Sequence, residues 1–399
     1  MANTSAERAA QELLEHCLAE RPWPEHLLDA LLDGDGSRAL FRVVVERLGD
    51  LFEPRLCSVY ADLFSEVIAR RIPGLHAKHL ASRYERVRRT RKFDRDPASI
   101  HNVFVLSRVT LGADVAVTSV LLDAAKQCFP NARVWFAGPV KNWQLFQGDS
   151  RLTHLPIAYG RGGTVDDRLA IWEKLRGSVA QAQNIVIDPD SRLTQLGLLP
   201  ICAEEDYYFF ESRSYGAPGR DPLPILTARW AEETFGSTAP RPYIATSLDA
   251  AQFTTTVSFG VGDNPEKRVD GSFEEELLRV LPRPVLIDKG AGGEEAERVE
   301  RAVAAAGPGV STWDDSFAGF AEHIARSSLY VGYDSAGGHV ASACGVPQIS
   351  IAAGFASERM AERWRPPQAK VVRAIDYPAS DALMRAVSGL VLEFGFKVS

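Results

Sequence analysis

The feature that most constrains the fold is a series of short, fully apolar segments that alternate with helical patterns from residue 100 onward. VFVL, VWFA and IVI occur between residues 103 and 187, and VSF, PVLI and LYVGY repeat the pattern between residues 257 and 333. Strands that are apolar on both faces belong to parallel sheets covered by helices on both sides. We therefore predict an α/β chain with two doubly wound parallel sheets.

The first hundred residues follow a different pattern. Apolar residues recur there at a spacing of three to four, and proline or glycine separates the segments, so we expect an all-helical N-terminal domain at 1–98. This domain ends in a basic run from Arg83 to Arg95. We interpret the run as a solvated helix face, and a seat for an anionic acceptor or membrane surface is the alternative.

Proline and glycine cluster between residues 215 and 242, around one helical segment. We place the boundary between the two sheets there. This gives one Rossmann-like domain at 99–237 and another at 238–399, with the last helix free to pack back onto the first of them. The carboxyl ends of the strands in both domains would face a common cleft, where sheets of this kind bind ligands.

Composition narrows the class of protein. The chain of 399 residues is 45% hydrophobic and carries a net charge of -7, which argues against nucleic acid held by a basic surface. No apolar window is long enough to span a membrane, and the N-terminus lacks the apolar segment of a signal peptide. We expect a cytoplasmic protein whose only membrane contact would be peripheral, at an anionic inner-membrane surface.

The segment DSAGGHVASACGVP follows the LYVGY strand. Gly337 and Gly338 would allow a ligand to approach closely or the backbone to take a positive φ. The next helix would offer free N–H groups at its N-terminus, which suits a diphosphate. His339 could donate to a phosphate oxygen, and Asp334 and Ser335 could fix the turn or bind a hydroxyl. A plain strand-to-helix connection is the alternative.

Two further glycine-rich loops belong to the same predicted sheet edge. The loop SFGVGDNPEKRV offers backbone amides and fixed cations to a phosphate, through Gly260, Gly262, Asn264, Lys267 and Arg268. The loop DKGAGG leads into Glu294 and Glu295 at the start of a helix. These carboxylates either complement the helix dipole or hold a sugar hydroxyl.

Taken in order, these motifs resemble glycosyltransferase family 9, the ADP-heptose:lipopolysaccharide heptosyltransferases. DSAGGHVASACGVP is similar to that family's D-S/T-G-x-x-H-x-x-A-A-x-G-x-P signature, and FGVGDNPEKRV is similar to its donor-phosphate loop. SRVTLGADVAVTSVLL resembles its first strand end and G-D loop, and IDPDSRLTQLGLLP resembles a later strand and helix. The resemblance covers residues 100–365 and implies GT-B architecture, two Rossmann-like domains that face a cleft.

The resemblance also implies roles by position. Asp114 falls on the catalytic base, Lys267 on the lysine that meets the donor phosphates, and Glu294 on the acid that holds the ribose. The loop around the diphosphate and sugar corresponds to Asp334, Ser335, Gly337, Gly338 and His339.

The resemblance also concerns the nucleobase pocket, and it is incomplete at two positions. Trp313 and Asp315 fall where the family lines its nucleobase pocket, and ordinary packing is the alternative for the tryptophan. Two positions depart from the family pattern. Its G-D pair reads Gly112-Ala113-Asp114 here, and the glycine after its Asp-Ser pair is Ala336.

The implied activity is an inverting, metal-independent glycosyl transfer in cell-envelope glycan or lipopolysaccharide synthesis. The co-substrate would be a nucleoside-diphosphate sugar similar to ADP-heptose, and the acceptor a hydroxyl of a glycan or glycolipid. No cofactor or metal is implied, because Lys267, His339 and the helix amides would neutralise the leaving diphosphate. The Asp188-Pro189-Asp190 segment leaves a D-x-D metal site open as an alternative.

A second hypothesis comes from a different class of function. The chain could be a catalytically silent nucleotide-sugar binder or assembly factor with the same fold. The altered Gly112-Ala113-Asp114 loop favours this hypothesis, and the joint presence of Asp114, Lys267 and His339 favours the enzyme.

Overall fold

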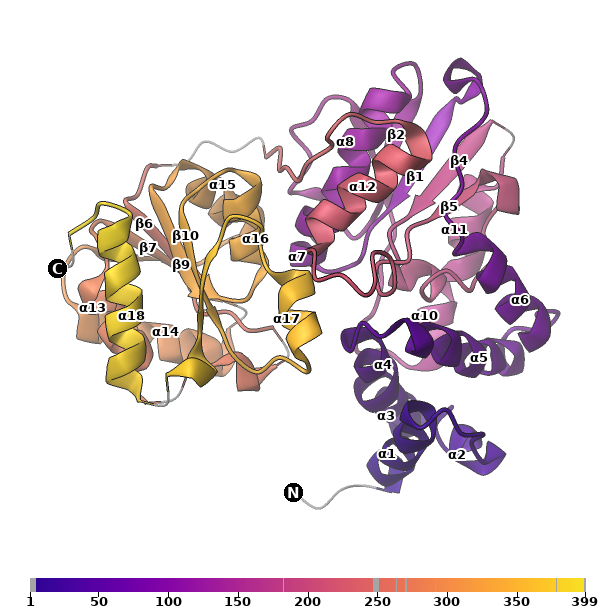
Figure 1. Ribbon diagram of the computed structural model, residues 1–399, viewed down its shortest axis with the longest axis horizontal. Helices are drawn as coiled ribbons and strands as arrows, with labels where there is room; N and C mark the ends of the chain where they lie inside the picture. Colours follow the sequence, from indigo (N-terminus) through magenta and orange to yellow (C-terminus); the bar gives the residue numbers. More distant parts are fainter. Residues whose placement is uncertain are drawn as a thin grey trace.

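The computed structural model describes residues 5–181, 183–246, 251–262, 264–269, 271–290, 292–377 and 379–397. Two lobes lie side by side, each built on one parallel sheet, and the N-terminal helices extend from the first lobe (Figure 1). The predicted α/β class, with two doubly wound sheets and a helical N-terminal part, is confirmed.

The first lobe contains a five-stranded parallel sheet in the order β3-β2-β1-β4-β5. Its strands are β1 (Asn102–Leu106), β2 (Arg133–Gly138), β3 (Leu152–Pro156), β4 (Asn184–Asp188) and β5 (Tyr207–Phe209). Its helices are α7 (Leu111–Ala113), a π-helical turn (Asp114–Thr118), α8 (Ser119–Cys128), α9 (Val140–Trp143), α10 (Val165–Leu169), α11 (Ile171–Val179) and α12 (Leu223–Phe235), with 3-10 turns at Arg192–Thr194 and Glu204–Asp206. The strand order reverses between β1 and β4, so a ligand crevice is expected at their carboxyl ends.

The second lobe repeats this plan with six parallel strands in the order β11-β10-β9-β6-β7-β8. The strands are β6 (Thr255–Ser258), β7 (Val285–Asp288), β8 (Val310–Trp313), β9 (Leu329–Tyr333), β10 (Gln348–Ala352) and β11 (Lys370–Arg373). The helices are α13 (Phe273–Val280), α14 (Gly293–Ala306), α15 (Phe317–Arg326), α16 (Ala336–Ala343), α17 (Glu358–Trp364) and α18 (Ser380–Glu393), with 3-10 turns at Pro265–Lys267 and Ala374–Asp376. Here the order reverses between β6 and β9.

The N-terminal part is helical throughout, as predicted. It contains α1 (Ser5–Leu18), α2 (Glu25–Asp29), α3 (Gly34–Ala39), a π-helical turn (Leu40–Val45), α4 (Glu46–Asp50), α5 (Pro54–Arg71) and α6 (Ala77–Val87), and a 3-10 turn at Pro97–Ser99 leads into β1. These helices share one apolar core with the first sheet. Phe41, Tyr60 and Phe64 pack in the same cluster as Phe104 and Phe209, so the N-terminal helices are part of the first lobe.

The basic run of residues 83–95 holds these helices on the sheet. Arg88 pairs with buried Glu211 at 2.7 Å, and Arg95 pairs with Asp206 at 2.7 Å. Further arginines of the run contact residues 197–208. Our interpretation as a solvated face was wrong, because the pattern of charge does not show that a complementary acidic segment lies next to it.

The two lobes meet through α16 and α17. One apolar cluster contains Val115 and Leu121 of the first lobe together with Phe320 and Val340 of the second. We had allowed for the last helix to pack back onto the first lobe, and it does not do so. Instead α18 packs on its own sheet, where its buried apolar residues join the cluster of β6, β9 and β10.

The helices of the described residues also bear on a possible membrane span. None of the helices that they form combines the length and the apolar character needed to cross a bilayer.

Candidate functional site

The first part of the candidate site lies at the carboxyl end of β9. Asp334 follows the strand, and Ser335 is the N-cap residue of α16. The Nζ atom of Lys267 lies 2.5 Å from Oδ2 of Asp334, and the two side chains are only 15% and 11% exposed. The fold therefore brings together the two loops that the sequence separates. One N–H of the ammonium group is used by Asp334, and two remain for an anion.

Of the two adjacent glycines of this loop, Gly337 serves packing. Gly337 and Gly338 are both helical, and neither has a positive φ, so of the two roles that we considered for them the positive-φ turn does not occur. A Cβ atom on Gly337 would lie 2.3 Å from the hydroxyl oxygen of Tyr330. Glycine at this position lets α16 lie directly on β9. A Cβ atom on Gly338 would meet nothing closer than 3.4 Å.

His339 lies where the two lobes touch. It is 6% exposed, and its ring centroid is 5.8 Å from that of Trp364. A Cβ atom on Gly112 of the first lobe would lie 3.1 Å from the imidazole Cδ2. Burial lowers the pKa of His339, so the ring is neutral near pH 7 and can donate one N–H. The first-lobe loop thus closes over the N-terminal turn of α16.

The other two glycine loops meet at Glu295. A Cβ atom on Gly290 would lie 2.5 Å from Oε1 of Glu295, and one on Gly260 would lie 3.0 Å from the same oxygen. The Glu294 side chain is 80% exposed, and its Oε1 lies 4.0 Å from Nη1 of Arg268. Glu295 is therefore better placed than Glu294 to hold a sugar hydroxyl beside these loops. The sequence indicated both glutamates, and their different contacts in the structure distinguish them.

The remaining residues of the phosphate loop have internal contacts. Asn264 donates from Nδ2 to the carbonyl oxygen of Gly354 at 3.1 Å and accepts from the backbone N–H of Glu266 at 3.0 Å. Gly262 has a φ of 61°, a conformation that glycine adopts without strain. These contacts hold the loop that presents Lys267.

Trp313 and Asp315 both have contacts with the segment that leads into α15. The Nε1 atom of Trp313 donates to the carbonyl oxygen of Ser316 at 2.9 Å, and its ring centroid lies 4.8 Å from that of His323. Asp315 is exposed and accepts from the backbone N–H of Ser316 at 2.7 Å. Ordinary packing, the alternative for Trp313, describes this arrangement.

Asp114 is the first-lobe acid for which the family resemblance implies the base role. Its side chain is 0% exposed. Both oxygens are occupied by four donors at 2.6 Å: the Ser107 and Thr118 hydroxyls, the Asn142 amide and the backbone N–H of Arg108. Burial raises the pKa of the carboxyl. Placed in this way, Asp114 ties the β1 loop to the following helix, and both of its oxygens are engaged by the protein in this structure; the base role stays a prediction of the resemblance.

The backbone around Asp114 explains this placement. The helix from Leu111 to Cys128 is continuous but passes through a π-helical turn from Asp114 to Thr118. Such a turn carries one residue more than an α-helical turn. Asp114 is the first residue of this turn, and its carboxylate is directed inward.

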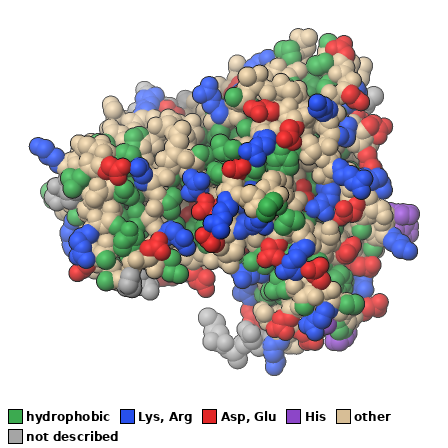
Figure 2. Space-filling view, in the orientation of Figure 1, with side chains coloured by type: hydrophobic (Ala, Val, Ile, Leu, Met, Phe, Trp, Pro, Cys, Tyr) green, Lys and Arg blue, Asp and Glu red, His purple; other side chains and the backbone are tan. Residues whose placement is uncertain are grey.

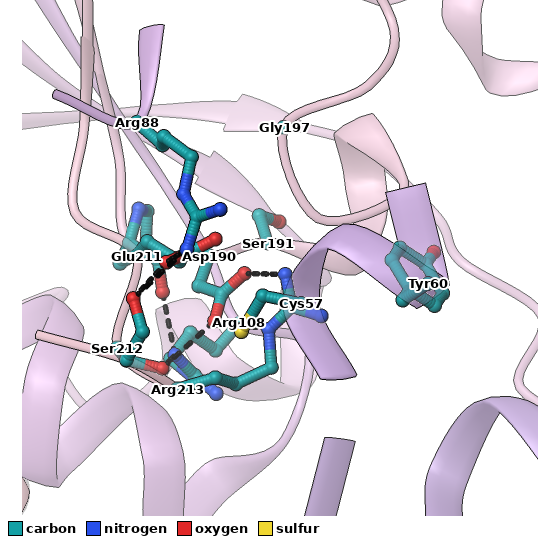
Figure 3. Close-up of polar contacts among 12 residues, drawn as sticks. Cys57, Tyr60, Arg88, Arg108, Asp190, Ser191, Gly197, Glu211, Ser212 and Arg213 are labelled. Carbon is teal, nitrogen blue, oxygen red and sulfur yellow. Dashed lines mark hydrogen bonds and ion pairs between the residues drawn. The ribbon is translucent and has the colours of Figure 1, made fainter. Parts of the chain in front are cut away.

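Asp188 and Asp190 are also engaged by the protein. Asp188 accepts from the Tyr207 hydroxyl at 2.5 Å and the backbone N–H of Ser191 at 2.7 Å. Asp190 accepts from Arg213 through Nε at 3.0 Å and Nη2 at 3.1 Å (Figure 3). These contacts account for both carboxylates without the D-x-D metal site. Within the described ranges no cluster of three His, Cys, Asp or Glu side chains is arranged to hold a metal.

The second part of the site is a cavity of about 210 Å³ at the switch point of the first sheet. Its walls come from α4 and the residues after it, from the ends of β1 and β4, and from Trp364 of the second lobe. Five arginines and three acids line it, namely Arg108, Arg161, Arg168, Arg192 and Arg213 with Glu46, Asp50 and Asp190. The excess of cations suits an anionic or strongly polar ligand. In Figure 2, charged side chains of both signs gather where the lobes meet.

Two charged side chains of this cavity form no hydrogen bond or ion pair within the described residues, although the charge of Arg192 lowers the pKa of Asp50. Asp50 and Arg192 are both half-buried, and neither side chain has a hydrogen bond or ion pair with any residue that the structure describes. The Nη1 atom of Arg192 is completely buried and unpaired. An unpaired buried donor is costly unless a ligand or water completes it. Sequence reasoning missed both residues, because nothing local connects α4 to the end of β4.

A larger cavity of about 390 Å³ lies in the second lobe. It opens beside Asp334 and is bounded by the ends of β10 and β11 and by α17. The Lys267–Asp334 pair therefore has space next to it for part of a ligand.

No family model and no curated protein matches the sequence. Among solved structures, a family 9 glycosyltransferase of Veillonella parvula superposes with a TM-score of 0.55 at 15% identity, over 76% of this chain and 100% of that one. The E. coli heptosyltransferase WaaC gives a TM-score of 0.56 at 16% identity, over 72% of this chain and 99% of that one. The chain has the fold of the family 9 glycosyltransferases.

A third structure agrees. The E. coli ADP-heptose lipopolysaccharide heptosyltransferase II gives a TM-score of 0.52 at 14% identity, over 73% of this chain and 99% of that one. The resemblance of the sequence to this family is thereby confirmed at the level of the GT-B fold. Of the family positions, Lys267, Asp334, Ser335 and His339 lie together in this fold, and Asp114 lies beneath the surface next to them.

Proposed function

We propose that the protein is a glycosyltransferase that moves a sugar from a nucleoside-diphosphate sugar to a hydroxyl acceptor. The observation that carries the proposal is the Lys267–Asp334 pair at the N-terminal turn of α16. It lies at the switch point of a Rossmann-like sheet, where an anion and a helix N-terminus complement each other. The fold supports the same assignment, and solved structures of WaaC include complexes with ADP and with ADP-2-deoxy-2-fluoro heptose.

Each element of the donor side has a proposed task. Lys267 and the free amides of α16 would bind the diphosphate, and His339 would donate its N–H to a phosphate oxygen. Glu295 would hold a ribose hydroxyl beside the loops of Gly260 and Gly290. Because the cations that stabilise the leaving group belong to the protein, we propose a reaction without a metal or other cofactor. Attack from the face opposite the diphosphate would invert the anomeric centre.

The acceptor side leads to a broader proposal. We propose a heptose-like donor and a hydroxyl acceptor on a cell-envelope glycan or glycolipid, as in lipopolysaccharide synthesis, with the reaction in the cytoplasm. We do not propose that residues 83–95 bind a membrane surface, because most of their arginines are paired within the first lobe.

Calorimetric titration with ADP-heptose tests donor recognition. Removal of a charge-assisted phosphate contact costs about 1.5 to 3 kcal/mol, so Lys267→Ala should weaken donor binding by about ten- to a hundredfold. Lys370→Ala is the matched control. Lys370 is an exposed lysine at the start of β11 in the same lobe, and it pairs with Glu393. EDTA should not change the wild-type affinity. Equal affinities for the two variants would argue against the proposed donor site.

The silent binder remains the second candidate, and one observation favours it. The acid at the family's base position is fully buried and saturated with hydrogen bonds. A binder would take up ADP-heptose with the affinity pattern described above but release no nucleotide. Measurement of free ADP after incubation with excess donor separates the two candidates.

A further inference from the structure

We propose that the N-terminal helices supply the general base of the transfer, and that this base is Asp50. The proposal rests on the proposed glycosyltransferase function and adds the residue that accepts the proton of the acceptor hydroxyl. It also gives the N-terminal helices a task in the reaction.

The position of Asp50 is the first argument. It is the last residue of α4 and lines the 210 Å³ cavity at the ends of β1 and β4. The chain just after it reaches the second lobe. The Nη1 atom of Arg359 in α17 donates to the carbonyl oxygen of Phe52 at 3.1 Å, and the ring centroids of Phe52 and Trp364 are 6.3 Å apart. Asp50 thus stands where the N-terminal helices, the first sheet and the second lobe meet.

The second argument is the contrast with Asp114. All four donors around Asp114 are in place, so a protonated or relocated side chain would leave them unpaired. Asp50 has no such partner among the described residues, although it is half-buried. Its oxygens are therefore free to accept a hydrogen bond from an acceptor hydroxyl.

The charges around Asp50 provide the third argument. Burial raises the pKa of Asp50 to about 6, and Glu46 acts in the same direction. Arg192, Arg47 and Lys267 lower the pKa. A base with a pKa close to the working pH is effective in proton transfer. The influence of Lys267 places Asp50 within electrostatic range of the lysine that would meet the donor phosphates.

The far wall of the cavity contributes further charges. Arg108 and Arg168 use some of their N–H groups on backbone carbonyl oxygens, and Arg161 lies beside them. Asp190 is neutralised by Arg213. Because cations exceed acids on these walls, a negative charge that develops on the acceptor oxygen would be stabilised there.

Backbone strain is the fourth argument. In the part of the chain that the structure describes, eight residues other than glycine have positive φ. Four of them line this cavity: Phe52 at 52°, Val109 at 63°, Asp190 at 69° and Leu196 at 56°. A positive φ is costly for such side chains, and strain of this kind gathers at functional sites.

The proposed step is a displacement at the anomeric carbon. The acceptor O–H gives its proton to the Asp50 carboxylate while the oxygen forms a bond to the anomeric carbon. The bond from that carbon to the diphosphate oxygen breaks, and its electron pair leaves with the nucleoside diphosphate. The protonated Asp50 then returns its proton to solvent.

The test uses the full chain, with ADP-heptose as donor and water as the acceptor that is always present. We would measure the rate of ADP release and the donor affinity for the wild type, Asp50→Asn and Glu12→Gln. Glu12 is an exposed acid of α1 and is not among the residues that line the cavity, so its variant removes one negative charge from the N-terminal helices without changing the site. Loss of a general base lowers the rate by about 10² to 10⁴.

Two results together would support the proposal. Asp50→Asn should lose at least about a hundredfold in kcat with its donor affinity preserved, while Glu12→Gln stays close to the wild type. The wild-type kcat/KM should also fall below about pH 6, and the residual rate of Asp50→Asn should lack this decline.

Two results would overturn it. One is an Asp50→Asn variant that releases ADP at the wild-type rate, and the other is an equal loss in both variants. Melting curves verify that the variants are folded. A wild type that binds ADP-heptose but never releases ADP would overturn the glycosyltransferase function itself, and this outcome is distinct from a loss specific to Asp50.

Discussion

At the scale of single residues, two aspartates have opposite surroundings. Asp114 is buried among four hydrogen-bond donors, whereas Asp50 is half-buried without a hydrogen bond or ion pair to any described residue. The first arrangement stabilises a fold, and the second is typical of a group that acts on a ligand. The family motif indicated Asp114 as the base. A position in the sequence does not show whether neighbouring donors already engage the carboxylate.

Replacement of Asp114 tests its structural role. Asp114→Ala would leave the Ser107, Thr118 and Asn142 side chains and the Arg108 amide without their acceptor. Each buried unsatisfied group costs about 1 to 3 kcal/mol, so we expect the free energy of unfolding to fall by about 3 kcal/mol or more. Urea denaturation measures this change. A variant as stable as the wild type would show that Asp114 does not hold the loop.

Replacement of Asp50 should change stability in the opposite direction. Its pKa is about 6 in the folded protein and about 3.9 in an unfolded chain. Since the folded state binds this proton more tightly, the associated stability is present below about pH 4 and is lost as the pH rises through about 6. Asp50→Asn removes the charge, so it should stabilise the protein at pH 8 by roughly 1 to 2 kcal/mol after allowance for solvent screening.

Scanning calorimetry at pH 5 and pH 8 checks this expectation. The gain in melting temperature of Asp50→Asn over the wild type should be larger at pH 8. A more stable but less active variant is the usual sign of a strained active-site residue. A gain that is equal at both pH values would mean that burial does not shift the titration of Asp50.

At the scale of elements, the sequence predicted the regular parts well. Apolar runs located β1, β2, β4, β6, β7 and β9, because strands buried on both faces need such runs. The turn conformations were not predicted. Whether Gly337 serves a turn or a close contact depends on Tyr330, and whether Asp114 points inward depends on a π-helical turn.

The two glycines of α16 give a prediction with an internal control. A Cβ atom on Gly337 would lie 2.3 Å from the Tyr330 hydroxyl, so Gly337→Ala should destabilise the protein by about 1 to 3 kcal/mol through overpacking. Gly338→Ala meets only an ordinary contact at 3.4 Å and should be neutral or slightly stabilising, since alanine favours the helix. Thermal unfolding of both variants provides the comparison, and an equal effect would contradict the packing role of Gly337.

At the scale of the whole molecule, the N-terminal helices join both lobes. They share a core with the first sheet, and the residues after α4 contact α17 of the second lobe. The helical spacing of apolar residues identified residues 1–98 as a separate unit. That spacing does not show that α4 ends at the crevice. Long-range placement of this kind depends on packing between segments that no local pattern connects.

The central claim is that this molecule turns over a nucleotide sugar. ³¹P nuclear magnetic resonance of ADP-heptose incubated with the wild type in EDTA observes this directly, with Lys267→Ala as the comparison. Our account predicts that ADP accumulates with the wild type and at least about tenfold more slowly with Lys267→Ala. Persistence of intact ADP-heptose at saturating protein, despite measurable binding, would contradict it.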